Sequence, residues 1–250
     1  VPEWHEERAQ KRTSGLPAAV DTVIEHLRYR LYPNDRNAVF MGVDDFLFQE
    51  TETVEILSHV KYGSVRCAVT RTDQDALKGE TAHTLVIPTT LKEIGPYAFA
   101  YMQNLKRVVI PSSVRTIKRG AFAGCTNLSS ITIEPGVRLI EGTSFAGTGI
   151  TSITIPNTVK DLQTYVFEDC KKLKTVKLPE GIKKIGECLF MGCESLTSVV
   201  VPPTVTEIGE RAYYDCKSLS SVTLPEGLVK ICDGAFSDTS LTSLVIPSTV

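Results

Sequence analysis

The sequence lacks the features on which several common functions depend. It has no run of the roughly 18–20 apolar residues that a membrane-spanning helix needs, and no recognisable signal peptide. Its 27 lysines and arginines face 29 acidic residues, so the formal net charge is −2 and no general positive field attracts nucleic acid or anionic lipid. We therefore expect no nucleic-acid partner and no direct insertion into a membrane.

Residues typical of catalytic and metal sites are also sparse. No Cys-x-x-Cys pair with zinc spacing and no glycine-rich phosphate loop occurs. None of the four histidines has a spaced carboxylate or cysteine that would suggest a metal site or a nucleophilic triad: His5, His26, His59 and His83. The sequence therefore predicts no enzyme, no metal and no cofactor, and leaves as an alternative an active site that only the fold assembles.

From Leu85 to Val250 the sequence repeats itself with a period of 22 or 23 residues. One column follows each short apolar segment: Pro88, Pro111, Glu134, Pro156, Pro179, Pro202, Pro225 and Pro247. An aromatic column keeps the same register: Phe99, Phe122, Phe145, Phe167, Phe190, Tyr213 and Phe236. A fixed period of this length predicts a solenoid, in which each unit buries its apolar side against its neighbours.

A single unit, residues 173–195, shows why the repeat folds. Val176 and Leu178 flank Lys177 in the alternating pattern of a strand, and Pro179 ends the strand because it has no N–H to donate. Phe190 then supplies the largest apolar side chain of the unit. We expect this mostly β and irregular unit to bury Phe190 in the core.

Four of the seven cysteines occupy one position of the repeat, which other units fill with methionine or threonine: Cys125, Cys170, Cys193 and Cys216. Residues that interchange in this way fill volume, so we expect buried free thiols. A disulfide between Cys193 and Cys216 is the alternative, because neighbouring units could bring their Cα atoms within bonding range. The odd number of cysteines argues against a fully disulfide-linked scaffold.

The repeat can be written L-x-x-h-x-h-P-x-x-h-x-x-I-x-x-x-A-F-x-x-C-x-x-L, where h is apolar. It occurs as LKRVVIPSSVRTIKRGAFAGCTNL at 105–128 and LSSVTLPEGLVKICDGAF at 219–236. This pattern resembles the BspA-like, or Treponema-type, leucine-rich repeat family. The resemblance implies a right-handed leucine-rich-repeat solenoid with a parallel β-sheet on one face. It also implies an adhesin or ligand-binding module at the cell surface or secreted, with a cytoplasmic location as the alternative.

Residues 1–80 do not fit the repeat, and we expect them to cap the open end of the solenoid. Apolar residues at helical spacing predict an amphipathic helix over about 17–31, and residues 53–57 and 64–69 predict a β-hairpin. The expected organisation is an N-terminal α+β cap over 1–80, or an independent domain, followed by repeats over 81–250. The last unit stops before its isoleucine and phenylalanine positions, so we expect a sequence truncated in mid-repeat.

The outward strand positions form two columns that are rich in hydroxyl groups and poor in charge. The first column is Arg107, Ser130, Ser152, Thr175, Ser198, Ser221 and Ser243; the second is Val109, Thr132, Thr154, Lys177, Val200, Thr223 and Val245. Such residues are either tolerated on solvated strands or form an extended ligand-binding face. The sequence does not separate these two interpretations.

A second candidate surface is a set of lysines within one unit: Lys171, Lys172, Lys174, Lys183 and Lys184. These residues either form a solvated surface or a basic patch that binds an anionic ligand. The leading hypothesis is a monomeric, non-enzymatic binding or adhesion module that docks a protein or a glycan on the sheet face. The alternative is a structural spacer that holds another domain away from an anchor.

Overall fold

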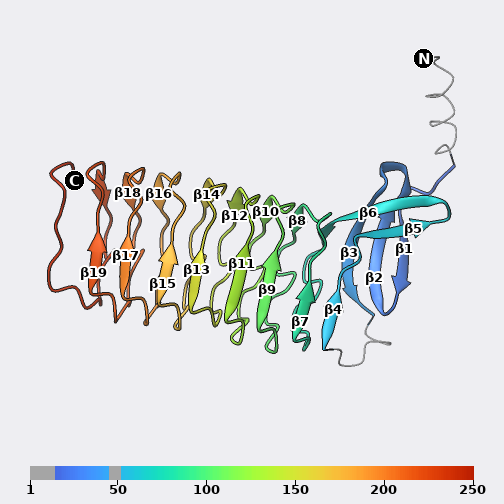
Figure 1. Cartoon of the computed structure of the whole chain (residues 1–250), viewed down its shortest axis with the longest axis horizontal. Coiled ribbons are helices and arrows are strands. Elements are labelled where there is room, and N and C mark those ends of the chain that lie inside the picture. Colours follow the sequence, from blue (N-terminus) through green and yellow to red (C-terminus); the bar gives the residue numbers. More distant parts are fainter. Residues whose placement is uncertain (1–14, 45–51) are drawn as a thin grey trace, which may run out of the picture.

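The computed structural model describes residues 15–44 and 52–250 as an elongated β-solenoid, with strands β1–β6 at one end and the last repeat at the other (Figure 1). The only helix in these two ranges is a single 3₁₀ turn, η1 (Pro33–Asp35). No described helix is long and apolar enough to cross a bilayer. The solenoid predicted from the repeat is confirmed.

One side of the solenoid, the long-strand face, receives a strand of three or four residues from each of seven successive repeats. These strands are β7 (Thr84–Val86), β9 (Arg107–Ile110), β11 (Ser130–Ile133), β13 (Ser152–Thr154), β15 (Thr175–Lys177), β17 (Ser198–Val200) and β19 (Ser221–Thr223). Every pairing among them is parallel. Their central residues point into the core, as the alternating sequence pattern predicts.

A second side, the short-strand face, carries two-residue strands. They are β8 (Glu93–Ile94), β10 (Thr116–Ile117), β12 (Leu139–Ile140), β14 (Asp161–Leu162), β16 (Lys184–Ile185), β18 (Glu207–Ile208) and β20 (Lys230–Ile231). These strands also pair in parallel, so the parallel sheet expected on one face is joined by a second parallel ladder that was not predicted. The cause is the inward turn after the proline: Val114 and Ile117 are both fully buried, which aligns this segment with its equivalents in the neighbouring repeats.

The aromatic column fills the core beside a third, turn-rich side. Successive rings from Phe99 to Phe236 lie 5.3–5.7 Å apart, and from Phe122 onward their planes differ by 15° or less. Backbone bonds hold the spacing, because the N–H of each core aromatic donates across to the next repeat, as Phe167 does to the carbonyl of Leu189 at 3.0 Å. The predicted burial of Phe190 is confirmed, since its side chain is fully enclosed.

The N-terminal region contains antiparallel strands where a helix over 17–31 was predicted, and that prediction was wrong. β1 (Val20–Ile24) and β2 (Leu27–Tyr32) form a hairpin. Glu25 and His26 connect them with φ values of 49° and 70°, as in the two-residue turns that suit twisted strands. The same residues fit helical spacing and strand alternation, and the turn with its β-branched and aromatic neighbours favours strands.

The predicted hairpin around Gly63 exists, but its first strand was assigned to the wrong residues. β6 (Val65–Thr72) pairs antiparallel with β5 (His59–Tyr62), whereas β4 (Thr53–Glu55) pairs in parallel with β7 of the long-strand face. β3 (Asn37–Val43) pairs with β2 and with β6, and β6 continues in parallel to β8. Apart from η1 and the connecting turns, the region before the repeats is therefore built from strands over the residues described, and its sheets continue into the solenoid.

The turn-rich side begins before residue 81. Leu77 is fully buried, and its N–H donates to the carbonyl of Ala98 at 2.6 Å, as the N–H of Phe99 donates to Ala121. Asp75 and Gly79 have the positive φ values that recur at the corresponding positions of later repeats. A leucine thus takes the aromatic position in this first turn.

Both strand-bearing faces are interrupted, and the interruptions alternate. On the long-strand face no pairing joins β11 to β13 or β15 to β17, and on the short-strand face none joins β14 to β16. At each interruption the opposite face is paired: β12 with β14, β16 with β18, and β13 with β15. Every junction between these repeats therefore keeps strand pairing on one of the two faces.

The seven cysteines are free, and the four that share one repeat position are fully buried, as predicted. Each of these four thiols donates to the carbonyl of the phenylalanine in the preceding repeat, at sulfur–oxygen distances of 3.1–3.2 Å. Burial raises the pKa of the Cys125 and Cys216 thiols to about 12 and that of Cys170 to about 11. The cysteine column therefore links repeats as well as filling volume.

We expect a thiol reagent such as Ellman's reagent to modify Cys232 first in the folded protein. Cys232 is partly exposed, whereas the other six cysteines are buried and the buried thiolate is disfavoured. Mass spectrometry of peptides after brief labelling would identify the modified residue. Rapid labelling of Cys125, Cys170 or Cys193 without prior unfolding would contradict the packing described.

Candidate ligand-binding face

The two predicted columns lie side by side on the long-strand face. Strand pairing places their members opposite one another: Arg107 with Ser130, Val109 with Thr132, Ser152 with Thr175, Thr154 with Lys177, Ser198 with Ser221, and Val200 with Thr223. Thirteen of the fourteen predicted residues are exposed and Ser130 is half-buried, with Ser243 and Val245 continuing the exposed columns beyond β19. The geometry expected for an outward face is present, and its use in binding remains a proposal.

A groove of about 930 Å³ opens on this face where β11 and β13 do not pair. Serine and threonine hydroxyls dominate its polar lining, from Ser129, Ser130, Thr132, Thr151, Ser152, Thr154 and Thr158. Asn157 and Lys177 add an amide and a cation, and no carboxylate lines the groove. Its surface can therefore donate and accept hydrogen bonds along its length and carries one positive charge.

An irregular repeat between β11 and β13 lies at this groove. The repeat is one residue short before Ile150, and Gly149 lies so close to the preceding unit that an added Cβ would come 2.2 Å from the carbonyl oxygen of Thr126. Glu134 replaces the usual proline, and its N–H donates to the carbonyl of Ile110 at 3.0 Å, a bond that proline cannot make. All four residues of β11 pair with β9, and none pairs with β13.

A smaller groove, of about 340 Å³, lies at the next interruption, between β15 and β17. Thr175 and Ser198 continue the hydroxyl lining, while Val200 is 71% exposed and supplies an apolar contact. Glu180 adds one carboxylate here. Lys177 lines both grooves and therefore lies between them.

The predicted set of basic residues is divided between two surfaces. Lys171, Lys172 and Lys174 precede β15, whereas Lys183 directly precedes β16 and Lys184 begins it, and β16 lies in a different sheet. Ion pairs also reduce the positive charge, because Lys171 contacts Glu194 at 3.2 Å and Lys184 contacts Glu207 at 3.0 Å. The five lysines that cluster in the sequence therefore do not present one continuous face.

Residues 15–44 and 52–250 contain no group of three or more histidine, cysteine, aspartate or glutamate side chains that could hold a metal ion. His26 and His83 are exposed, and the ring of His59 contacts Ser58 and Arg66 at 3.2 Å. His5 lies outside the described residues. The site chemistry on the described chain is that of hydroxyl, amide and lysine groups lining open grooves.

Similar solved structures share this architecture. A leucine-rich repeat protein from Bacteroides ovatus is 28% identical, with a TM-score of 0.85 over 92% of this chain and 60% of that one. The T. pallidum leucine-rich repeat protein is 23% identical, with a TM-score of 0.70 over 80% of this chain and 91% of that one. The pneumococcal vaccine antigen PcpA is 16% identical, with a TM-score of 0.62 over 92% and 71%. This chain thus spans 60% of the length of the Bacteroides ovatus protein.

No curated protein matches the sequence significantly. The family model described as the BspA type leucine rich repeat region matches six copies over residues 70–148 and 138–250. This match covers well over half of the chain and starts where the first buried leucine turn begins, near Leu77. Together with the parallel strands and the aromatic column, it shows that this chain belongs to the BspA-type leucine-rich repeat family.

Proposed function

We propose that this chain is a non-enzymatic binding module that docks a protein or glycan ligand on the long-strand face. The observation that carries the proposal is the groove of about 930 Å³ at the β11–β13 interruption, which is lined mainly by hydroxyl groups. Open depressions with several convergent hydrogen-bonding groups are the usual form of a binding site. Repeat proteins also commonly bind ligands across such extended faces.

The proposal includes a location at the cell surface or outside the cell and an adhesive role. Membership of a family that is typically non-catalytic supports the binding role. A protein of the same fold is named as a vaccine antigen, which supports the surface location. The long, regular axis of the solenoid also favours a spacer as the second candidate (Figure 1). A spacer predicts that deletion of two internal repeats leaves binding by a neighbouring domain unchanged.

Substitution of Ser152, Thr175 and Ser198 together by glutamate tests the long-strand face. We expect any interaction detected on a glycan array or an array of purified extracellular proteins to weaken by about tenfold or more, because a docked ligand would bury unpaired carboxylates. All three side chains are exposed, so the variant should fold. Binding measured by biolayer interferometry would quantify the loss.

A matched control places three glutamates on exposed hydroxyl residues away from this face, at Ser64, Ser218 and Ser237. This control should bind like the parent protein, since it has the same change in net charge. If the variant of the long-strand face retains every interaction, the face is not the ligand-binding site. Equal weakening in both variants would attribute the effect to net charge.

A further inference from the structure

Five consecutive repeats carry a cation at the same position, just before each strand of the short-strand face. This basic column comprises Lys92, Arg115, Arg138, Lys160 and Lys183, all of which are exposed. Backbone bonds stack the first four directly, since Arg115 donates to Lys92 at 2.8 Å, Arg138 to Arg115 at 2.9 Å, and Lys160 to Arg138 at 2.9 Å. Neighbouring positions in such a ladder lie about 4.8 Å apart.

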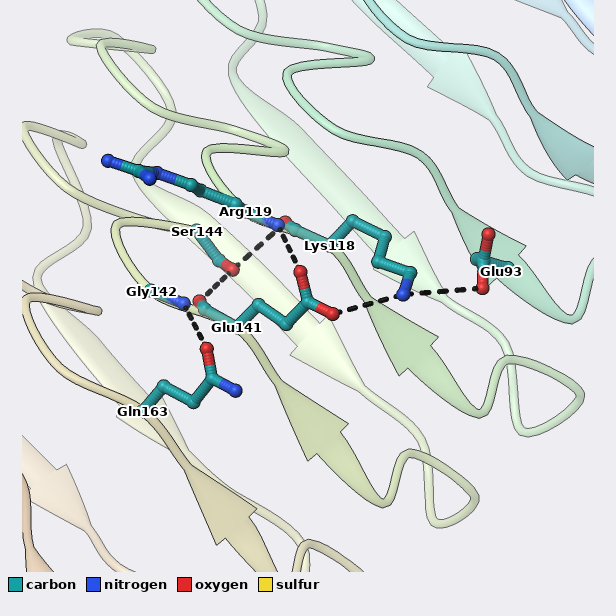
Figure 2. A network of polar contacts seen from close by, with 7 residues as sticks. All are labelled: Glu93, Lys118, Arg119, Glu141, Gly142, Ser144 and Gln163. Atoms are coloured by element: carbon teal, nitrogen blue, oxygen red, sulfur yellow. Dashed lines mark hydrogen bonds and ion pairs between the residues drawn. The ribbon is translucent and has the colours of Figure 1, made fainter.

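The charge of the basic column is not neutralised by ion pairs. None of its five members makes one within the described residues, although other cations on the same face do. Lys118 occupies the nearby carboxylates of Glu93 and Glu141, at 3.8 and 3.0 Å (Figure 2). Asp161 directly follows Lys160 and offsets part of the charge there.

Bonds within the solenoid explain only two members of this column. Arg115 donates to the carbonyls of Ser112, Val114 and, in the next repeat, Gly136, and Lys160 donates to that of Asn157. Arg138 and Lys183 make no side-chain hydrogen bond in the described structure, and like charges in register on neighbouring repeats repel each other. An anionic ligand would relieve the repulsion.

A groove adjoins the C-terminal end of the column. It measures about 470 Å³ and lies where β14 and β16 do not pair, so that Lys160 and Lys183 stand on its two sides. Gln163 and Thr164 line it as well and can hydrogen-bond to uncharged groups. The surface therefore combines a line of cations with a polar depression.

We propose that the basic column binds a linear anionic polysaccharide whose chain lies along the solenoid axis. Carboxylate or sulfate groups recurring along an extended chain would pair with successive cations, and sugar hydroxyls would bond to Gln163 and Thr164 in the groove. The column contains no aromatic side chain on which a nucleic-acid base could stack. β10 and β12 are paired on both sides, and the free edges at the groove belong to β14 and β16, whose two residues each are too few to direct an added peptide strand.

The test uses the triple substitution Arg138→Gln, Lys160→Gln and Lys183→Gln. Heparin and polygalacturonate serve as sulfated and carboxylated probes, and dextran as the uncharged one. We expect the parent chain to bind both anionic probes, to bind dextran at least about tenfold more weakly, and to lose affinity as ionic strength rises. The triple variant should lose about tenfold or more in affinity for the anionic probes.

A charge-matched control removes three exposed lysines outside the column, through Lys61→Gln, Lys106→Gln and Lys217→Gln. It should keep the affinity of the parent chain. Lys183→Gln alone provides a milder variant if the triple one melts early, and should weaken binding measurably. Equal loss in the two triple variants, dextran binding as tight as heparin binding, or tighter binding of single-stranded DNA or poly-glutamate would each overturn the proposal.

Discussion

Replacing Phe190 by alanine is expected to lower the free energy of unfolding by about 3–5 kcal/mol. The side chain is fully buried between Phe167 and Tyr213, at ring-centroid distances of 5.5 and 5.4 Å. Its neighbours cannot close the resulting cavity freely, because backbone hydrogen bonds between repeats fix their spacing. Urea unfolding followed by circular dichroism would measure the change.

Phe236 provides a control of the same residue type. It is only partly buried and stacks on Tyr213 alone, so Phe236→Ala should cost clearly less than the substitution of Phe190. Ser198→Ala should be close to neutral, since Ser198 is exposed on the long-strand face. A loss below about 1 kcal/mol for Phe190→Ala would contradict the enclosed aromatic column.

Replacing Gly42 by alanine is expected to destabilise the protein by about 2–4 kcal/mol. Gly42 lies in β3 with φ at 117°, a conformation that favours glycine, and an added Cβ would lie 2.1 Å from the carbonyl oxygen of Ala76. Ala76 belongs to the first turn of the solenoid, so the new methyl group would push the N-terminal strands away from it. Thermal and urea unfolding would report the loss.

Gly79 separates the steric effect from the conformational one. Its φ is also positive, at 80°, but an added Cβ would meet no atom within 4 Å. Gly79→Ala should therefore cost only about 1 kcal/mol, the penalty of the left-handed conformation. Equal losses at Gly42 and Gly79 would show that close contact between β3 and the first turn does not limit stability.

The repeat could be predicted from the sequence because its chemistry recurs at every unit. Prolines, inward apolar residues and aromatic residues each keep one register, and their burial follows from that register alone. The second parallel ladder was missed because its strands are only two residues long, too short to show alternation. Pairing between repeats defines these strands, and a single unit contains no sign of it.

The region before the repeats was harder to predict. Val20, Ile24, Leu27 and Leu31 satisfy the spacing of a helix and that of a hairpin, and only Val23, which is exposed, fits the helix alone, so periodicity did not decide between them. The first turn was hidden because Leu77 replaces the aromatic residue. Its pattern Asp-Ala-Leu nevertheless corresponds to Tyr-Ala-Phe around Phe99. A repeat pattern that allows leucine as well as an aromatic residue at this position would have included the first turn.

The two candidate surfaces differed in how far the sequence could locate them. The hydroxyl columns follow directly from strand alternation, but the grooves depend on where strand pairing stops, which is a three-dimensional property. The basic column has a clear signal, because each of its members directly follows an inward residue: Leu91, Val114, Val137, Val159 and Ile182. The column is not visible when lysines are compared within a single repeat, and it becomes visible when the same position is compared across successive repeats.

The alternating interruptions of the two strand-bearing faces have a mechanical consequence. A pull along the solenoid axis loads every junction in series, so the weakest junction sets the force at which the protein yields. The unpaired faces fall at different junctions, and the opposite face carries the load wherever one face is open, as β13–β15 does opposite the gap between β14 and β16. The solenoid thus has grooves on both strand-bearing faces without acquiring a plane of easy fracture.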